Sequence, residues 1–181
     1  MSPVAPMGDP DDRALLARIQ AGDDRAFTAL VEAWTPRLLR WLTATGCPHH
    51  DAEDVVQETF LRVHRHAEAY RPRWAVSTWL FTIAHRIRLD LPRRSTETVP
   101  ELAAPVAPDP VGGGLWELAR DLLGPEGHHL LWLRYGEDLE PGAIAGILGI
   151  SGLACRVRLH RARARLRTAL ADRGDPVECL P

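Results

Sequence analysis

The stretch DAEDVVQETFLRV, residues 51–63, repeats apolar side chains at helical spacing and therefore predicts an amphipathic helix. Asp51 can accept hydrogen bonds from the free amides of a first helical turn, and Asp54 lies three residues further on, so we expect the helix to begin at Asp51. The face that would enter a core consists of Ala52, Val56, Thr59, Phe60 and Val63. The opposite face consists of Asp54, Gln57, Glu58 and Leu61. By periodicity alone, that second face is a solvated surface with one exposed leucine.

Length and composition limit the fold only loosely. A chain of 181 residues with 45% hydrophobic content can bury one medium core or two small ones. The net charge of −2 excludes a uniformly basic nucleic-acid binder, but the charge is uneven. Residues 151–170 contain six arginines and no acid, whereas residues 95–114 contain three acids and no arginine. This asymmetry predicts separate roles for separate parts of the chain.

The helical and breaking signals predict an all-α protein made of two small helical domains joined by a flexible linker. Residues 1–10 are a proline-rich lead-in, and Asp12 and Asp23 are expected to cap two helices separated by a left-handed stop at Gly22. A further helix is expected from Ser77 to about Leu91. The predicted limits are 11–94 for the first domain, 95–114 for the linker, 115–173 for a helix-turn-helix domain and 174–181 for a tail.

Export and membrane signals are not recognisable in the sequence. The N-terminus has no charged region followed by an apolar run, and no apolar stretch approaches about 18 residues, so we expect no membrane insertion. Three scattered cysteines are too few for a disulfide framework, which fits a reducing cytoplasm.

The stretch 51–63, together with WLFTIAHRIRLD at 79–90, resembles the second conserved region of the extracytoplasmic-function (ECF) sigma factors, small promoter-recognition subunits of bacterial RNA polymerase. In that family the first of these helices docks on the clamp helices of the polymerase. The resemblance therefore implies that Asp54, Gln57, Glu58 and Leu61 bind core RNA polymerase.

The loop YRPRWAV, residues 70–76, interleaves arginines with aromatics, which is the composition that a reader of unpaired bases needs. Without the resemblance, Trp74 or Trp79 is more typical of a core or lid residue. With it, the expected contacts to the melted minus-ten element are Arg71, Arg73, Trp74, Trp79, His85 and Arg86. The sequence departs from the family pattern at His85, where Asn is common, and at Pro92, which interrupts a basic run.

The segment GILGISGLACRVRLHRARARL, residues 146–166, predicts the turn and second helix of a helix-turn-helix. Its expected buried stripe is Cys155, Leu159, Ala162, Leu166 and Ala169. It resembles the fourth conserved region of the same family, which reads the minus-thirty-five element. The expected DNA contacts are Ser151, Arg156, Arg158, His160, Arg161 and Arg163. The match fails at residues 152–155, where Gly-Leu-Ala-Cys replaces a more usual small-Gly-Thr-Val run.

The predicted function is that of an ECF-type sigma factor without catalysis or a cofactor of its own. Its expected partners are core RNA polymerase, through the clamp helices and the flap, promoter DNA and an anti-sigma factor. One alternative is a helix-turn-helix regulator that acts without docking on the polymerase. Another is an enzyme with a zinc site at Cys47, His49 and His50, three potential ligands in a turn that lacks a matching second pair.

Overall fold

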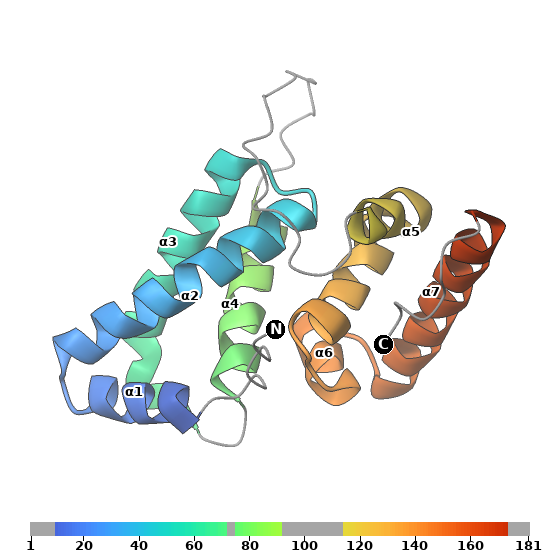
Figure 1. The fold of residues 1–181 in the computed structure, drawn as a ribbon. Helices are drawn as coiled ribbons and strands as arrows, with labels where there is room; N and C mark the ends of the chain where they lie inside the picture. Colours follow the sequence, from blue (N-terminus) through green and yellow to red (C-terminus); the bar gives the residue numbers. More distant parts are fainter. Residues whose placement is uncertain (1–9, 72–74, 92–113, 174–181) are drawn as a thin grey trace. The chain divides into compact units, whose positions relative to one another are not determined.

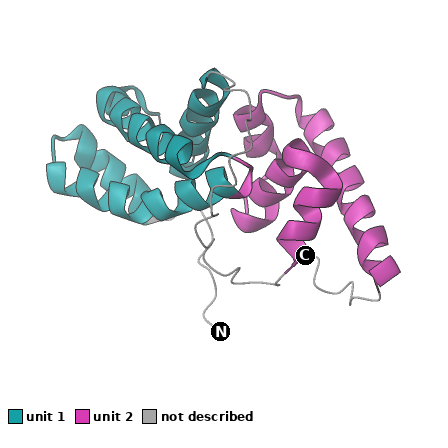
Figure 2. Cartoon of the chain, turned by 90° about the horizontal axis from the view of Figure 1, so that it is seen from above, with its two compact units in different colours: residues 1–43, 47–103 teal, residues 44–46, 104–181 magenta. Residues whose placement is uncertain are grey.

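The computed structural model describes residues 10–71, 75–91 and 114–173, and the regular elements in these ranges are all helices (Figure 1). The predicted all-α fold is therefore confirmed for this part of the chain. The chain divides into two compact units, residues 1–43 with 47–103 and residues 44–46 with 104–181 (Figure 2). The predicted domain limits stay predictions. Apart from Pro10 and Gly114, the predicted lead-in, linker and tail lie outside the described residues.

The first unit contains α1 (Pro10–Gln20), α2 (Asp24–Ala44), α3 (His49–His66), a single 3₁₀ turn (Ala67–Ala69) and α4 (Val76–Asp90). Helices α3 and α4 pack along each other, and α1 packs on the 3₁₀ turn and on α4. Large aromatic side chains join α2 to this pair: the Phe81 ring centroid lies 5.9 Å from that of Trp34 and 5.2 Å from that of Trp41. All three side chains are fully buried, so they form the centre of the first core.

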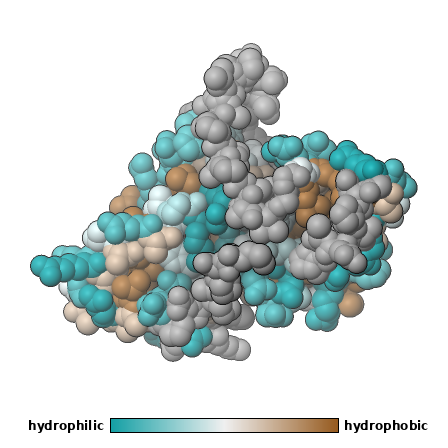
Figure 3. All heavy atoms as spheres, viewed as in Figure 1, coloured by the Kyte–Doolittle hydropathy of each residue, from teal (hydrophilic) through white to brown (hydrophobic). Residues whose placement is uncertain are grey.

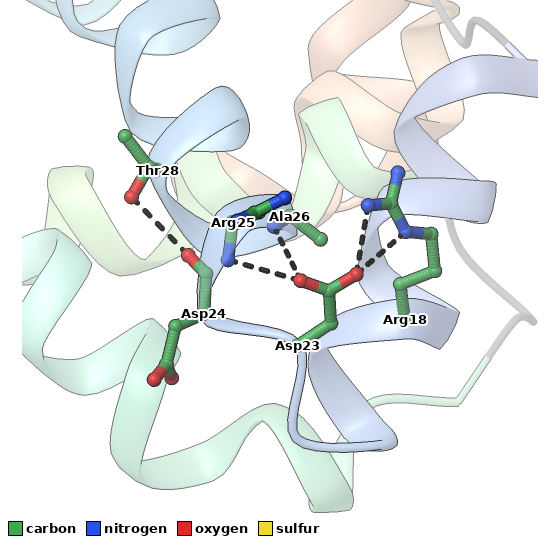
Figure 4. Close-up of polar contacts among 6 residues, drawn as sticks. All are labelled: Arg18, Asp23, Asp24, Arg25, Ala26 and Thr28. Atoms are coloured by element: carbon green, nitrogen blue, oxygen red, sulfur yellow. Dashed lines mark hydrogen bonds and ion pairs between the residues drawn. The ribbon is translucent and has the colours of Figure 1, made fainter.

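Asp23 caps α2 as the sequence predicts (Figure 4). Its Oδ1 accepts hydrogen bonds from the backbone N–H groups of Arg25 at 3.0 Å and Ala26 at 3.3 Å. Its Oδ2 accepts from Arg18 Nε at 2.9 Å and Nη2 at 2.7 Å, and this contact is the main reason that the pKa of the Asp23 carboxyl is lowered. Gly22 has φ +85°, which confirms the left-handed stop between the two helices.

Two of the predicted caps are wrong. Helix α1 begins at Pro10, so Asp12 lies in its first turn, where its buried carboxylate accepts a hydrogen bond from Trp34 Nε1 at 3.0 Å. Helix α3 begins at His49 after an N-cap Pro48 that makes no side-chain cap bond, so Asp51 also lies inside the helix. The ring of Pro48 fixes its φ at −54°, and its ψ of 147° is not helical, so α3 begins directly after it, two residues before Asp51. Asp12 of α1 has a different role, because the buried indole of Trp34 on α2 requires an acceptor for its N–H.

The second unit contains α5 (Leu115–Leu131), a π-helical turn (Trp132–Gly136), α6 (Pro141–Leu148) and α7 (Gly152–Arg173). Helix α5 has a break at Gly124, whose φ of 67° and ψ of −179° are not helical, as expected from the Gly-Pro pair. Helices α5 and α6 both pack on α7. Gly136 lies close against the Trp132 indole. A Cβ added at position 136 would be only 3.2 Å from the ring, so glycine permits this close approach. Trp132 Nε1 in turn donates to the buried Glu137 at 3.2 Å.

Hydropathy separates the interior from the surface in the usual way. In the view of Figure 3, the described surface is mainly hydrophilic, and apolar side chains show as small separate groups. Within residues 10–71, 75–91 and 114–173, no single helix is long and apolar enough to cross a membrane. Helices α6 and α7 reach that length and composition only together, as a pair bent by 106°.

Candidate functional sites

Helix α3 divides sharply into a buried and an outward face. Its buried residues are Ala52, Val55, Val56, Thr59, Phe60 and Val63, which confirms the predicted core face and adds Val55. The Thr59 hydroxyl is satisfied inside the helix by donating to the Val55 carbonyl at 2.7 Å. The predicted docking residues occupy the other side: Asp54 and Gln57 are exposed, and Glu58 is half-buried. Leu61 is 50% exposed.

These four side chains form what we call the α3 outer face: Asp54, Gln57, Glu58 and Leu61. The spacing i, i+3, i+4 and i+7 places them on one side of the helix, where the large apolar side chain of Leu61 is surrounded by hydrogen-bond acceptors. Glu58 Oε1 accepts from Arg62 Nε at 2.8 Å, an i,i+4 ion pair on the edge of this face. The arrangement provides an acidic rim and one apolar contact point, which suits a partner with basic and apolar groups.

The predicted strand-reading residues are only partly described. Arg73 and Trp74 lie outside the described residues. Arg71 is exposed, and its guanidinium donates to the carbonyls of Glu68 at 3.0 Å and Tyr70 at 3.3 Å. The half-buried Trp79 packs against Tyr70 with its ring tilted by 49°, and the ring centroids are 5.1 Å apart. Burial of Tyr70 raises the pKa of its phenol.

The segment before residues 72–74 is anchored from α1. Gln20 Nε2 donates to the Ala67 carbonyl at 2.8 Å and to the Tyr70 carbonyl at 3.4 Å. The aromatic pair Tyr70–Trp79 is thereby held at a fixed position beside the start of α4. Arg86 is exposed seven residues beyond Trp79, two helical turns along the same side of α4.

His85 does not join this surface. Its side chain is 8% exposed, and burial, together with the charges of Arg88 and Arg86, lowers its pKa to about 4. A neutral, buried imidazole is part of the packing between α4 and its neighbours rather than an outward contact. The sequence position alone did not indicate this, because His85 lies next to the buried Ala84 and the exposed Arg86.

Helices α6 and α7 have the geometry of a helix-turn-helix. Their axes are bent by 106° across a three-residue turn, within the range of about 90–120° typical of the motif. Gly149 ends α6 in the left-handed conformation with φ 66°, and Ile150 N–H donates to the Ala145 carbonyl at 3.0 Å. The Ser151 hydroxyl accepts from the Ala154 N–H at 3.1 Å and so caps α7. Ser151 is exposed, but its oxygen is already used within the helix start.

The arginines of α7 differ in how far they are engaged. Arg163 is half-buried and its guanidinium carbon lies 5.9 Å from the centre of the Tyr135 ring. Arg165 Nη2 donates to the Leu122 carbonyl at 2.8 Å. In the described part of the chain, the exposed Arg156, Arg158 and Arg161 form no ion pair or side-chain hydrogen bond. His160 is exposed among them. These unneutralised charges make the outer side of α7 a strongly positive surface.

The buried stripe of α7 differs from the prediction at its last position. Cys155, Leu159, Ala162 and Leu166 are buried as expected, but the stripe ends in Leu170, and Ala169 is only half-buried. Sequence reasoning also missed Leu153 and Val157, which are 66% and 39% exposed. Their positions four residues apart place them on one face of the helix, and the helical period puts that face away from the buried stripe.

Metal ligation finds no support among the residues that the structure describes. No group of three or more His, Cys, Asp or Glu side chains there is arranged to hold a metal ion. His49 and His50 are exposed and face Glu53 and Asp51, at 3.4 Å and 3.2 Å, respectively. Cys47 is instead buried, and its burial raises the pKa of the thiol to about 11. The trio that the zinc alternative requires is therefore not brought together as a metal site among the described residues.

Comparison with known sequences places this architecture among transcription proteins. The sequence model described as Sigma-70 region 2 matches residues 30–98, a range that includes all of α3 and α4. The ECF RNA polymerase sigma factor SigE of Mycolicibacterium smegmatis is 33% identical over 186 residues, covering 93% of this chain and 71% of that protein. The ECF RNA polymerase sigma-E factor of Haemophilus influenzae is 40% identical over 73 residues, covering 40% of this chain but only 38% of that protein.

A solved structure is similar over nearly the whole chain. It is described as CnrH in complex with the cytosolic domain of CnrY, and it matches with a TM-score of 0.67 and 29% sequence identity. The match covers 90% of this chain and 97% of that one. The likeness therefore extends to both helical units and to the helix-turn-helix.

Proposed function

This chain belongs to the family of ECF RNA polymerase sigma factors, and from that premise we propose how its own surfaces perform promoter recognition. A sigma factor must bind the core polymerase and must also select DNA. The observation that carries the proposal is the contrast between the acidic α3 outer face and the arginine-rich outer side of α7. Each of the two tasks is assigned to one of these surfaces.

Core polymerase binds to the α3 outer face in this proposal. Leu61, half exposed in the free chain, becomes the desolvated anchor, and the acidic and amide groups of Asp54, Gln57 and Glu58 form the polar rim. The match to Sigma-70 region 2 includes these residues and supports the assignment. It also argues against the alternative of a regulator that acts without the polymerase.

The melted minus-ten strand binds beside the start of α4. The half-buried Trp79 offers an aromatic face that is held against the buried Tyr70, whose carbonyl accepts from Gln20, and Arg71 and Arg86 supply positive charge on the same unit. Stacking on an aromatic ring contributes about 1–3 kcal/mol per base and arginine tracks the backbone, so these groups suit an unpaired strand. We retain Arg73 and Trp74 in this proposal from the sequence, and we leave out the buried His85 as a direct contact.

The minus-thirty-five duplex binds to α7. The second helix of a helix-turn-helix enters the major groove, where arginines contact guanine edges and phosphates. Arg156, Arg158 and Arg161 carry unneutralised charge toward solvent, and His160 lies between them. We assign Arg163 and Ser151 supporting roles, because the first lies over Tyr135 and the second caps the helix.

The remaining features of the proposal concern regulation and chemistry. We propose that the chain acts in the cytoplasm as a binding subunit and that the polymerase carries out all phosphodiester chemistry. We also propose that an anti-sigma factor binds this chain. The relative CnrH, whose solved structure is a complex with the cytosolic domain of CnrY, supports such a partner.

In vitro transcription tests this proposal directly. Purified full-length chain is added to bacterial core RNA polymerase on a library of genomic fragments, and the 5′ ends of the transcripts are mapped. We expect new start sites that core enzyme alone does not use, preceded by a common pair of sequence elements. If added chain produces no new start site on any fragment, the proposed function is wrong.

A further inference from the structure

Two of the four large apolar side chains that are exposed in the described residues lie one turn apart on α7. Leu153 is 66% exposed and Val157 is 39% exposed. A single exposed leucine is common on protein surfaces. Two neighbouring exposed apolar side chains at the start of α7 are unusual, because most other exposed positions of this helix carry arginine.

The two side chains project away from the core of the second unit. Successive residues of an α-helix are rotated by about 100°, so Leu153 and Val157 lie within roughly 40° of each other around the axis. The centre of the buried stripe, formed by Cys155, Leu159 and Ala162, falls on the opposite side. The outermost line of the first two turns of α7 is therefore apolar.

Arginines frame this apolar line on both sides. The same rotation places Arg156 on one flank and Arg158 and Arg161 on the other. In the part of α7 that the structure describes, no acidic residue occurs before Asp172, near the end of the helix. An apolar centre with positive flanks complements a partner that is apolar in the middle and negatively charged along both edges.

The major groove of duplex DNA has this character at thymines. Its two phosphate backbones are negatively charged, and the 5-methyl group of thymine is the apolar feature on its floor. The groove is about 12 Å wide, which admits a helix of about 10–12 Å diameter, and residues at the start of a recognition helix reach the base edges. A protein partner would bury the same two side chains, but the paired positive flanks favour the polyanion.

We propose that Leu153 and Val157 read thymine in the promoter by packing against its 5-methyl group in the major groove. This inference rests on the proposed role of α7 as the duplex reader, and it adds the residues and the base that they select. It also gives meaning to the departure of residues 152–155 from the family pattern. Leu153 stands where the family pattern has glycine, and Ala154 stands where it has threonine. The start of α7 therefore offers hydrocarbon and no threonine hydroxyl, so its reading depends on methyl groups rather than on that hydrogen bond.

The test begins by identifying the site. A promoter library with a randomised minus-thirty-five element is selected with the full-length chain bound to core RNA polymerase, and we expect thymine at one or more fixed positions. Each fixed thymidine is then replaced by deoxyuridine, which removes the methyl group and keeps the base-pairing groups. For the unaltered chain we expect roughly fourfold weaker promoter binding per contacted methyl, the value of one buried carbon group.

The double variant Leu153→Ala, Val157→Ala supplies the decisive comparison. Both positions are exposed, so the helix should fold normally, and circular dichroism checks this. We expect the variant to bind the thymidine and deoxyuridine promoters equally. Leu89→Ala is the matched control, because it removes a leucine that is 67% exposed on α4 and should preserve the thymidine preference.

The outcomes separate this inference from the proposed function. If the selection enriches a defined element and the variant retains the full deoxyuridine effect, the inference is overturned while the duplex-reading role of α7 stands. The inference is also overturned if the enriched element contains no thymine. It is overturned as well if the double variant keeps its promoter binding and loses only its binding to core RNA polymerase. If no element is enriched although the complex with polymerase forms, the duplex-reading role itself fails, and the inference fails with it.

Discussion

Helices α3 and α7 are built alike on the inside and differently on the outside. Each buries one apolar stripe, ending in Val63 on α3 and Leu170 on α7, and each exposes a leucine, Leu61 or Leu153. On α3 the exposed leucine is surrounded by acids and a glutamine, and Glu58 pairs with a neighbouring arginine. On α7 the charges around the leucine are all positive. The stripe determines how each helix packs in its unit, and in our proposal the charge around it selects the partner.

The contrast has consequences for binding. A protein interface with a desolvated leucine and a small acidic rim depends largely on burial, so its affinity should fall only moderately with salt as the rim charges are screened. An arginine surface on duplex DNA releases counterions, so its affinity should fall steeply with salt. The two surfaces are therefore distinguishable by ionic strength as well as by mutation.

The largest expected effect comes from the two cores. Trp34→Ala should lower the free energy of unfolding of the first unit by about 3–5 kcal/mol, because it removes the packing against Phe81 and the bond to Asp12. Leu166→Ala should cost the second unit about 2–5 kcal/mol. Hydrogen exchange read by mass spectrometry measures protection helix by helix. We expect Trp34→Ala to reduce protection in the helices of the first unit and Leu166→Ala to reduce it in those of the second. Equal loss of protection in all helices with either variant would contradict this expectation.

The next effect concerns α7. Arg158→Ala with Arg161→Ala should weaken duplex binding and reduce the slope of log affinity against log salt by about one unit for each phosphate that the variant no longer binds. Binding of the polymerase-bound chain to a selected promoter, measured from 50 to 300 mM salt, gives this slope. Arg25→Ala removes an exposed arginine from α2 and serves as the control. An unchanged slope would mean that Arg158 and Arg161 do not face phosphates.

Acid should weaken both units in the same pH window. Burial lowers the pKa of His85 in the first unit and of His128 in the second from 6.5 to about 4. Between pH 6.5 and pH 4, each of these histidines is protonated in the unfolded chain but stays neutral in the folded chain. The stability is therefore complete above pH 6.5 and falls toward pH 4, by up to about 1.4 kcal/mol per pH unit for each histidine.

Urea unfolding at pH 7, 6 and 5 measures this dependence. His128 is 2% exposed and packs against both Trp116 and Trp132, with its ring centroid 5.7 Å and 6.0 Å from theirs. His128→Leu keeps an apolar group of similar size there and should flatten the pH dependence of the second unit alone. If the variant keeps the same dependence as the unaltered chain, the protonation of His128 is not responsible.

The smallest effect concerns the start of α7. Ser151→Ala removes the hydroxyl that accepts from Ala154 and should cost about 1 kcal/mol of stability. If Ser151 acts only as the cap, its replacement should weaken duplex binding no more than it lowers stability, although the O–H donor is not used by the cap bond. A loss of binding much larger than the loss of stability would instead assign Ser151 a direct DNA contact.

The periodic features of this molecule were predictable from the sequence. The core face of α3, the cap at Asp23, the stop at Gly22 and the turn at Gly149 all follow from local spacing or local backbone preference. The two wrong caps had a non-local or competing cause. Asp12 is drawn into the core by the indole of Trp34, which lies on another helix, and Pro48 starts α3 before the acids are reached.

The candidate sites follow the same rule. The outward direction of Asp54, Gln57 and Leu61 could be predicted, since it only requires the helical period. The burial of His85 could not, because it depends on how α4 packs against the rest of its unit. Likewise, the spacing of Leu153 and Val157 was visible in the sequence, but their exposure became evident only when the stripe ending in Leu170 was placed against α5 and α6.

The affinity for core RNA polymerase tests the central claim most directly. Three labelled full-length proteins are compared: the unaltered chain, the variant with Gln57, Glu58 and Leu61 all changed to alanine, and the Arg158→Ala, Arg161→Ala variant. Glu32→Ala, which removes an exposed acid from α2, is the matched control for the first variant. We predict that the α3 variant loses binding by about a hundredfold or more, as expected when a buried anchor and its rim are removed, with unchanged helicity. The α7 variant and the control should bind like the unaltered chain. Retained binding by the α3 variant, or an equal loss in both variants, would contradict the division of tasks between the two outer faces.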